Sequence, residues 1–535
     1  MDCGPPGAFA SHRHTRKQRH KAIMNNAHCF QTSLRDPEDF TLTFELVPSR
    51  GGRSHEHGRA LDFAREAVQD GRLRAVSITE NAGGHAALSP EVLGVEILHL
   101  GLDVIVHFSC KDKNRNQMES LLFAWDRLGL RNLLVLAGDY PKPGYQGLPK
   151  PVFDLDTVQA LDLVGRMNQA IFGADQLSAL ADPAEATAFF RGVVVSPFKY
   201  LEAELRMQYA KLHRKAAAGA GFVITQLGFD ARKFQEVLLY LRANHLELPV
   251  LGNVFIPNLT VTELMYRGEI PGCVIPAALY RQIRQEAAST DKGKGARLER
   301  AAKLLAVLKG LGFAGAHIGG PALVFADVKR VMDRAEELAA DWSACLPELH
   351  FWPDDSFYYF KRDKASGLNQ LEPSPTAGRI AGRLSGYDLT RRIHDLAFAP
   401  VGPLHVPVKK LCLALAATRL APGMAGLEHL IKFLAFRCQN CGDCTLSELA
   451  YLCPQSGCAK YLLNGPCGGS RDGWCEVYPG VKRCLYVRVY ERLVAHGCFQ
   501  ETLTDLVPPR DWALNNTSAW VSFFSGRDHV HLGEK

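Results

Sequence analysis

Short runs of β-branched and apolar residues alternate with amphipathic stretches from residue 40 to about residue 320. The apolar runs have the composition of buried strands, whereas the stretches between them, such as LDFAREAVQD and ARLERAAKLLAVLKG, repeat apolar positions at helical spacing. We therefore expect strands at residues 40–49, 75–82, 103–110, 132–139, 192–198, 222–229, 249–255 and 315–320.

A strand followed by a helix, repeated eight times, is the pattern of a closed parallel (β/α)8 TIM barrel, an α/β fold. A doubly wound open sheet is the alternative, but eight units in one uninterrupted series favour closure. We assign residues 36–345 to this barrel. Its chemistry should lie at the C-terminal ends of the strands.

Period-2 alternation predicts which strand residues point into the barrel. In the first strand Glu45 shares a face with two threonines, while its apolar neighbours share the other face. The same alternation turns Thr79 and His107 inward on the second and third strands. The fourth strand ends in Asp139, which reaches the interior only if the backbone turns there. A single polar residue of this kind is often structural, but polar residues on four successive strand ends predict a site.

The composition is that of a globular protein, with 535 residues, 47% apolar and 22% charged, and this length suggests at least two domains. A net charge of +6 is too dilute over this length to indicate nucleic acid binding. No apolar stretch is long enough to predict a membrane span. The sequence does not indicate an oligomeric state.

The first 35 residues differ from the rest, because HRHTRKQRHK is basic and lacks apolar periodicity. We interpret residues 1–35 as a disordered basic tail. A targeting peptide, a histidine metal site and a start at Met24 are the alternatives. Since no apolar signal segment is present, we expect a cytoplasmic location.

Eight of the 15 cysteines are concentrated near the C-terminus. They are Cys438, Cys441, Cys444, Cys453, Cys458, Cys467, Cys475 and Cys484. The opening C-x2-C-x2-C lets three sulfurs converge on one inorganic core, and eight thiolates suit two [4Fe–4S] clusters. Zinc is the alternative, and disulfides do not suit a reducing compartment. The spacing does not show which four cysteines group together.

These cysteines define a metal-binding domain at residues 431–500. Residues 346–430 are predicted to be a connector followed by helices, and residues 501–535 a C-terminal tail. A G-x-G-x-x-G pattern at Gly310, Gly312 and Gly315 follows a helix and precedes a strand, the reverse of a dinucleotide fingerprint. We interpret it as a helix-ending turn.

Several segments are similar to a known family. FELVPSR, VSITENAGG, VHFSCKD, VLAGDYP and RKAAAGAGFVITQLGFD resemble successive blocks of methylenetetrahydrofolate reductases, over about residues 40–330. CGDC, YLCPQSGCAK and NGPCGGSRDG resemble the C-terminal domain of a bacterial branch and the metal-binding partner subunit of acetogen enzymes. The resemblance implies an oxidoreductase acting on CH–NH donors, which uses flavin to reduce 5,10-methylenetetrahydrofolate to 5-methyltetrahydrofolate in one-carbon and methionine metabolism.

The resemblance also implies roles for particular residues. Glu45 would be the general acid that protonates the folate, with its pKa raised by burial between Phe44 and Leu46. Asp139 would be a second catalytic residue, near flavin and pterin, where its carboxylate can stabilise developing positive charge. The Gln226 amide would hydrogen-bond the pterin edge. The positions that match flavin contacts are Thr79, His107, Gly138, Asp139 and Lys215.

Two positions depart from the family pattern. Ala137 replaces an arginine, and Gln208 replaces an aspartate that contacts the ribityl chain. The resemblance implies FAD, and these departures leave FMN open as the alternative. NAD(P)H or a ferredoxin-like protein would supply electrons, and a protein partner would dock at the cysteine-rich domain. Two other functions remain open: a folate-dependent methyltransferase barrel without a redox step, and a metal-stabilised folate-binding scaffold that docks a partner.

Overall fold

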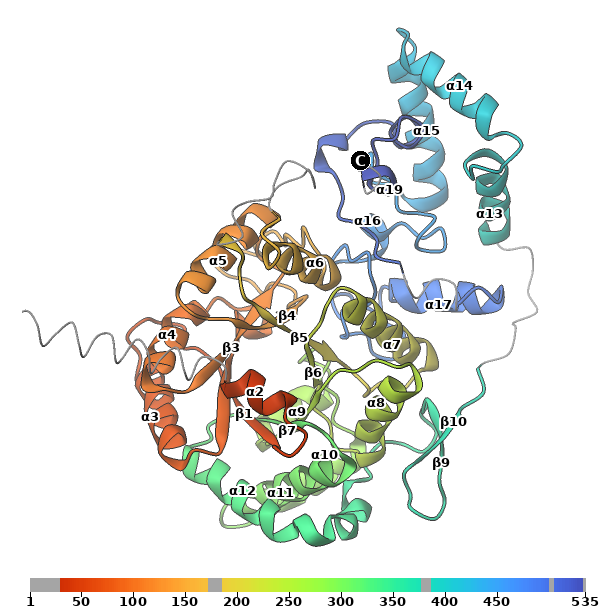
Figure 1. The fold of residues 1–535 in the computed structure, drawn as a ribbon. Helices are drawn as coiled ribbons and strands as arrows, with labels where there is room; N and C mark the ends of the chain where they lie inside the picture. Colours follow the sequence, from red (N-terminus) through yellow and green to blue (C-terminus); the bar gives the residue numbers. More distant parts are fainter. Residues whose placement is uncertain (1–28, 172–184, 377–385, 500–504, 533–535) are drawn as a thin grey trace, which may run out of the picture.

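A computed structural model of the chain describes residues 29–171, 185–376, 386–499 and 505–532 (Figure 1). Eight parallel strands close into one barrel, with neighbours in sequence also neighbours in space and the last strand paired with the first. The strands are β1 (Thr41–Leu46), β2 (Leu73–Ile78), β3 (Asp103–Ser109), β4 (Asn132–Leu136), β5 (Phe190–Val195), β6 (Phe222–Thr225), β7 (Val250–Phe255) and β8 (Gly315–Gly319). Each predicted strand overlaps an observed one, so the predicted TIM barrel is confirmed.

Helices cover the outside of the barrel (Figure 1). They are α3 (His55–Asp70), α4 (Pro90–Leu100), α5 (Arg115–Arg127), α6 (Thr157–Met167), α7 (Glu202–Ala217), α8 (Ala231–Ala243), α9 (Leu259–Tyr266), α10 (Ala277–Glu286), α11 (Lys294–Leu311) and α12 (Phe325–Leu338). Gly312 ends α11 in a left-handed conformation with φ +86°, and Gly315 begins β8. The glycine pattern is therefore a helix-ending turn, as predicted.

The two faces of the strands separate as the alternation predicts. Leu42, Phe44 and Leu46 of β1 belong to the large core between strands and helices. Ala75 and Ile105 belong instead to a smaller core inside the barrel. The polar residues near the strand ends therefore lie on the inner face, above this smaller core.

A short helix, α2 (Cys29–Arg35), covers the N-terminal end of the barrel. Phe30 is fully buried, and its ring centroid lies 5.2 Å from that of Phe222 on β6. The Phe30 backbone amide donates to the Asp103 carboxylate at 3.2 Å, and burial raises the pKa of Asp103 to about 7. Residues 29–35 are thus not part of a disordered tail, because the inside of the barrel needs an apolar cover. Residues 1–28 lie outside the described residues.

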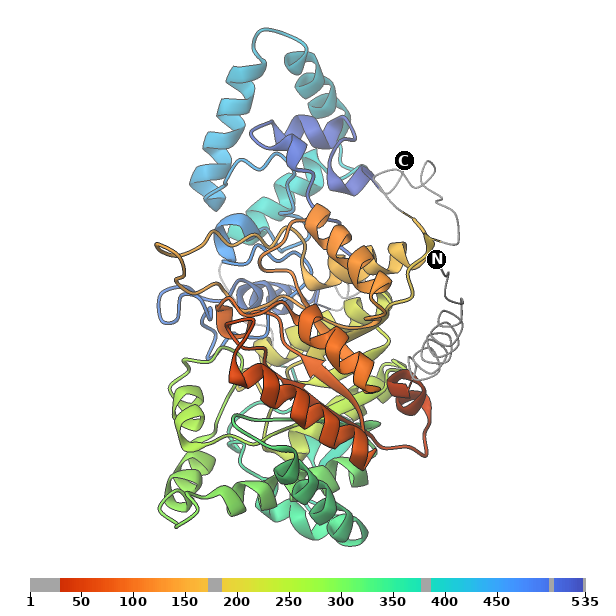
Figure 2. The same cartoon turned by 90° about the vertical axis from the view of Figure 1, so that its left-hand side faces the viewer.

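The predicted connector contains a hairpin that the sequence did not indicate. Its strands are β9 (Phe360–Arg362) and β10 (Asn369–Pro373), and Arg232 of α8 bonds to Asn369 at 2.7 Å. Three helices follow, α13 (Gly386–Ala397), α14 (His405–Ala416) and α15 (Ala421–Phe436). Both views show these helices projecting away from the barrel (Figures 1 and 2).

The cysteine-rich segment lies against the barrel (Figure 2). It contains the helical turn α16 (Pro454–Gly457) and ends in α17 (Leu485–Ala495), which packs against α7. Residues 505–532 are not an extended tail, because η5 (Trp512–Leu514), α18 (Ala519–Phe524) and α19 (His529–Leu532) fold back onto this segment. Within the described ranges, none of the helices is both long and apolar enough for a membrane span.

Candidate functional site

Three ionisable side chains meet inside the C-terminal end of the barrel, which we call the mouth. Glu45 of β1 faces His317 of the adjacent strand β8, with 3.8 Å between the carboxylate and Nε2. The other His317 nitrogen shares a 2.8 Å hydrogen bond with Thr43. On the other side of β1, His107 of β3 shares a 2.6 Å hydrogen bond with Ser77 of β2. Both imidazoles are therefore held in fixed orientations beside the carboxylate.

The electrostatics of Glu45 differ from the sequence-based expectation. Burial raises the pKa of the Glu45 carboxyl, but the neighbouring imidazoles, His317 first and His107 second, outweigh burial and hold this pKa below its ordinary value. The expected elevation is wrong for the chain alone, because His317 stabilises the carboxylate. Burial lowers the pKa of His107 to about 4, so this ring is neutral at pH 7.

Asp139 reaches the mouth because the backbone turns directly after β4. Gly138 has φ +83°, and a Cβ at this position would lie 2.3 Å from the Ser109 hydroxyl, so only glycine fits. After the turn, the Asp139 carboxylate accepts a 2.8 Å hydrogen bond from the Gly83 amide. The backbone turn that Asp139 needs in order to reach the barrel interior is therefore present.

Several buried polar atoms at this end of the barrel make no hydrogen bond to any described residue. They are Thr79 Oγ1, Ser196 Oγ, Gln208 Nε2 and Asn253 Oδ1. Buried polar groups in native proteins almost always have partners. Thr79 and Gln208 are also positions that match flavin contacts in the family, so these atoms fit the role of ligands for a polar cofactor.

The cysteine-rich segment contributes a glycine-rich loop, residues 465–470, to the mouth. A Cβ on Gly272 would lie 3.4 Å from the Gln226 amide nitrogen and 3.6 Å from the Gly468 carbonyl oxygen. Gln226 therefore lies close to this loop. Lys199 fixes the loop by donating to the carbonyls of Gly468 and Ser470. The folate position predicted at Gln226 thus lies where barrel and cysteine-rich segment meet.

Two buried lysines of α7 take different directions, Lys211 towards the cysteine-rich segment and Lys215 towards the barrel wall. Lys211 donates to the Pro466 carbonyl at 3.0 Å. Lys215 donates to the Val194 carbonyl of β5 at 2.5 Å, and burial holds its pKa well below the ordinary value, with nearby Lys211 lowering it further. The Lys215 ammonium is therefore directed at the barrel wall, and its contact with a flavin stays a prediction.

The eight cysteines divide into two sets of four, each lining its own cavity. The outer thiol set is Cys438, Cys441, Cys444 and Cys453. The inner thiol set is Cys458, Cys467, Cys475 and Cys484. Among the described residues all eight are free thiols. No three His, Cys, Asp or Glu side chains of the described ranges converge as ligands of a single metal ion, so the metal content stays a prediction.

The inner thiol set is tied to the mouth by Lys460. This lysine lines the cavity of the set, forms an ion pair with Glu476 and donates to the Gly138 carbonyl at 2.6 Å. Because Asp139 follows Gly138 directly, the inner thiol set lies beside the carboxylate that the sequence assigned to flavin and pterin.

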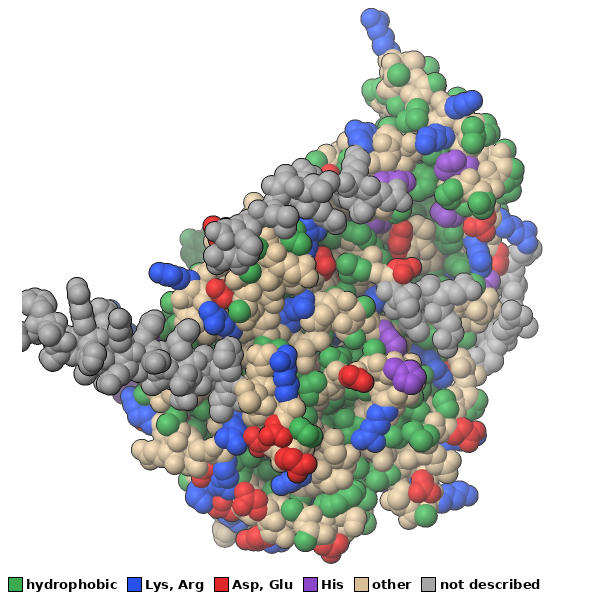
Figure 3. All heavy atoms as spheres, in the orientation of Figure 1, with side chains coloured by type: hydrophobic (Ala, Val, Ile, Leu, Met, Phe, Trp, Pro, Cys, Tyr) green, Lys and Arg blue, Asp and Glu red, His purple; other side chains and the backbone are tan. Residues whose placement is uncertain are grey.

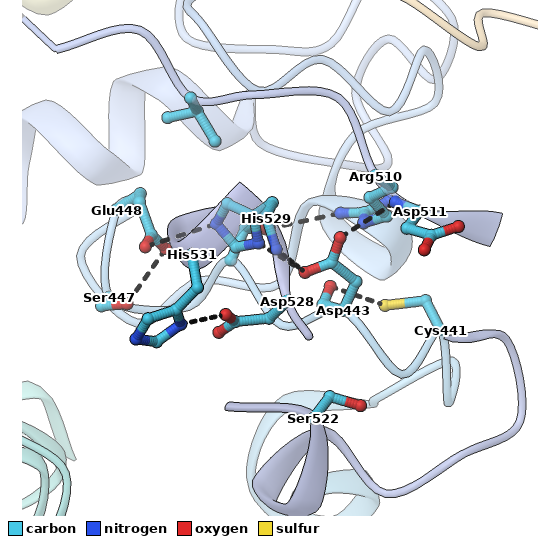
Figure 4. A network of polar contacts seen from close by, with 12 residues as sticks. Cys441, Asp443, Ser447, Glu448, Arg510, Asp511, Ser522, Asp528, His529 and His531 are labelled. Atoms are coloured by element: carbon cyan, nitrogen blue, oxygen red, sulfur yellow. Dashed lines mark hydrogen bonds and ion pairs between the residues drawn. The ribbon is translucent and has the colours of Figure 1, made fainter. Parts of the chain in front are cut away.

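A buried polar network supports the outer thiol set (Figure 4). Asp443, within the C-x2-C-x2-C run, accepts hydrogen bonds from the Asp511 amide at 3.0 Å and from the His529 amide at 3.2 Å. The His529 ring pairs with Asp443 through one nitrogen and lies 3.5 Å from Glu448 through the other. The chain beyond residue 505 therefore fixes the loop that carries three of the four outer thiols.

Sequence reasoning missed several of these residues. His317 had a detectable signal, since it is the one ionisable residue in a strand of small and apolar residues and lies opposite Thr43 in the barrel. Lys199, Lys460 and Glu476 had no such signal, because their partners come from distant parts of the chain.

The fold and the site together define the class of this protein. It is a (β/α)8 barrel with a carboxylate and two imidazoles in its mouth, joined to a segment that carries two thiol sets. Residues 30–318, more than half of the chain, match the family model described as Methylenetetrahydrofolate reductase. Residues 419–513 match a second model, described as Methylene-tetrahydrofolate reductase C terminal. The chain belongs to the methylenetetrahydrofolate reductase family and is thereby an enzyme acting on folate.

Comparison with curated proteins gives no match. Among solved structures, a Clostridium thermocellum protein described as uncharacterized and as binding two copies of 5-methyl-5,6,7,8-tetrahydrofolic acid is 12% identical, with a TM-score of 0.39; the match covers 58% of this chain and 98% of that protein. A 2,3-dimethylmalate lyase of the PEP mutase/isocitrate lyase superfamily is 15% identical, with a TM-score of 0.33; the match covers 59% of this chain and 86% of the lyase. Likenesses at this level carry no information on activity.

Proposed function

We propose that the chain is a flavin-dependent reductase that converts 5,10-methylenetetrahydrofolate to 5-methyltetrahydrofolate. The observation that carries this proposal is the placement of Glu45 in the mouth, between two oriented imidazoles and close to the cofactor positions. Family membership supports a folate substrate, and the geometry supports a reaction that needs a proton at a defined point.

The proposed reaction requires one proton before reduction. The methylene bridge must open at N10 to give an iminium ion, and Glu45 is the group positioned to donate that proton. In the chain alone His317 favours the carboxylate form of Glu45. A bound pterin that covered the exposed 28% of the Glu45 side chain would remove solvent from it and so oppose this effect of His317.

The residues proposed to hold the flavin are Thr79, His107, Gly138, Asp139 and Lys215, with Gln226 holding the pterin. When bound, the flavin supplies the hydride that reduces the iminium ion. A neutral His107 can donate or accept one further hydrogen bond, and the Thr79 hydroxyl, which has no partner among the described residues, can do both. We propose FAD, with FMN as the alternative.

We further propose that each thiol set binds one [4Fe–4S] cluster. Four thiols around each cavity supply the usual ligand number for such a cluster, and the outer set contains the C-x2-C-x2-C spacing. Anaerobic purification followed by iron, sulfide, zinc and flavin analysis tests this directly. Zinc without iron would replace the cluster proposal by a structural zinc site.

Two serine variants test the division of the thiols. Cys441→Ser and Cys467→Ser should each lower iron and acid-labile sulfide by about half, because each removes a ligand from a different cluster. Flavin content should fall less in Cys441→Ser, whose set is farther from the mouth. Full native metal content in both variants would show that neither set binds metal.

The reaction is tested with Glu45→Gln, with Glu38→Gln, an exposed carboxylate ahead of β1, as control. After chemical reduction of the flavin, its reoxidation by methylenetetrahydrofolate is followed by stopped-flow absorbance. Glu45→Gln should retain flavin but slow this step by about 10²-fold or more, the loss expected for a missing general acid. An unchanged rate would remove Glu45 from the acid role. Purified chain without a flavin spectrum would favour a methyltransferase, and a failure to form methyltetrahydrofolate would favour a binding scaffold.

A further inference from the structure

Helix α15 exposes its apolar face and buries its charged one. Glu428 and Lys432 are buried and form a 2.7 Å ion pair. On the opposite side, large apolar side chains at i, i+3, i+4 and i+7 are between 46% and 75% exposed. These residues are Leu427, Leu430, Ile431 and Leu434. A helix on a globular protein normally buries such a stripe.

The outer thiol set explains why α15 is turned in this direction. Glu428, His429, Lys432 and Phe436 line the cavity of that set. Glu428 also accepts hydrogen bonds from Ser518 and from the Trp520 amide, so its position is fixed from both sides. The polar face of α15 is thereby directed at the thiols, and the apolar stripe is left towards solvent.

The neighbouring helices extend the exposed apolar surface. On α13 the exposed apolar residues again follow helical spacing, at i, i+4 and i+7. The exposed apolar residues of α13, α14 and their connections are Leu389, Ile393, Leu396, Val401, Leu404, Val406, Leu411 and Leu420. Figure 3 shows apolar side chains over this projecting part of the molecule. We call these residues and the α15 stripe the apolar face; concentrated exposed apolar surface of this kind marks interaction sites.

The exposed charges around the apolar face are almost all positive. In residues 386–437 the exposed ionised side chains are Arg391, Arg392, Lys409, Lys410, Arg419, Arg437 and a single acid, Asp395. Two copies meeting through this face would bring like charges together, which opposes a symmetric dimer. A partner with a negatively charged contact surface is favoured instead.

The two thiol sets connect the apolar face to the mouth: residues of α15 line the cavity of the outer set, and Lys460 of the inner cavity bonds to Gly138. Cys453 of the outer set and Cys458 of the inner set are separated only by the helical turn α16. Five residues span at most about 18 Å when extended, and a helical turn is shorter. With a cluster in each set, an electron arriving at α15 would have a short route to the edge of the mouth, where Lys460 joins the inner set to Gly138.

We propose that the apolar face is the docking site of an acidic iron–sulfur protein that carries one electron at a time. This inference rests on the proposed reductase function. Two reduced carriers each lose one electron, and two protons are taken up per folate. One proton goes to N10 as the C–N10 bond breaks, and the second proton with the two electrons forms the new C–H bond. An anionic membrane surface is the competing occupant, but it gives no reason for the thiols to lie behind the face.

Binding is tested with the full, anaerobically purified chain and an acidic bacterial-type ferredoxin as the probe, by calorimetry at low and high salt. Leu430→Gln and Lys410→Glu should each weaken binding by about 10-fold, because one removes apolar contact and the other reverses a charge. The matched controls are Leu371→Gln and Lys364→Glu, exposed residues of the β9–β10 hairpin region. Equal affinities for all four variants would overturn the proposal.

Activity separates this inference from the reductase proposal. Reduction of methylenetetrahydrofolate with a reduced viologen dye should be unchanged in Leu430→Gln and Lys410→Glu, whereas ferredoxin-driven reduction should fall with binding. Dye-driven activity without any ferredoxin binding would reject the docking site and leave the reductase intact. Ferredoxin binding without dye-driven activity would reject the reductase. Two results without ferredoxin binding would also overturn the proposal. Binding to vesicles of anionic lipid that Leu430→Gln abolishes would assign the apolar face to a membrane. Salt-sensitive self-association that Leu430→Gln abolishes would assign it to a second copy of the chain.

Discussion

Asp156 joins the barrel to the cysteine-rich segment through a single buried carboxylate, so its replacement by asparagine should separate the two. One carboxylate oxygen caps α6 by accepting from the amides of Val158 at 2.8 Å and Gln159 at 3.2 Å. The other accepts from the Leu463 amide at 3.0 Å and from the Asn464 amide and side chain at 2.7 and 3.0 Å. These residues lead directly into the glycine-rich loop at the mouth.

Asparagine keeps the helix cap, because its carbonyl oxygen can take the place of the first carboxylate oxygen. Its amide group, however, points donors at three N–H donors. Each net hydrogen bond to a charged group contributes about 1.5–3 kcal/mol, and bonds that share one acceptor are not additive. We therefore expect Asp156→Asn to lower the free energy of unfolding by about 4 kcal/mol.

The assay is urea unfolding of the full chain followed by circular dichroism, together with the rate of thiol labelling in metal-free protein. Labelling of the inner thiol set should accelerate, because Cys467 lies in the loop that directly follows the released residues Leu463 and Asn464. Asp511→Asn is the control, since Asp511 also caps a helical turn but its side chain, within the described ranges, accepts a single hydrogen bond, from the Ala513 amide at 2.9 Å. A loss below about 1 kcal/mol would refute the reasoning, because it would mean that the three donors find other partners.

Three further outcomes are expected. Burial lowers the pKa of His529, but its two carboxylate partners outweigh burial and raise this pKa to about 9. The protonated ring therefore stabilises the folded protein fully below about pH 6.5, and this stabilisation is lost as pH rises through about 9. The urea midpoint should fall across this window in the wild type and should fall less in His529→Gln. Gln226→Ala should weaken folate binding by about 1–3 kcal/mol in calorimetry, and an unchanged dissociation constant would remove Gln226 from the pterin site. Gly442→Ala should lower the free energy of unfolding by about 2 kcal/mol or more, because φ is +71° and the added Cβ would lie 1.8 Å from the Leu514 carbonyl oxygen. Gly423→Ala is the control and should leave the free energy of unfolding unchanged, because the space around Gly423 is open.

The sequence alone determined the barrel and its inner face. Strand composition and helical spacing are local properties, and period-2 alternation follows from backbone geometry, so the orientation of Glu45 and His107 could be predicted without knowing their neighbours. The family resemblance then predicted that Gln226 and Asp139 belong to one site. Cysteine number and spacing predicted a metal-binding segment in the same way, because ligand clusters are visible in a linear sequence.

Only the tertiary structure decided the electrostatics of Glu45 and the division of the cysteines. His317 lies 272 residues from Glu45 in the chain, and only closure of β8 onto β1 brings its imidazole near enough to reverse the expected shift in the pKa of Glu45. The eight cysteines separate into two sets because the chain folds around two cavities, which spacing does not encode. The exposure of the apolar stripe of α15 could not be predicted from the sequence either. An apolar helical pattern predicts burial, but the buried Glu428–Lys432 ion pair beside the outer thiol set decides which face of α15 is turned inward.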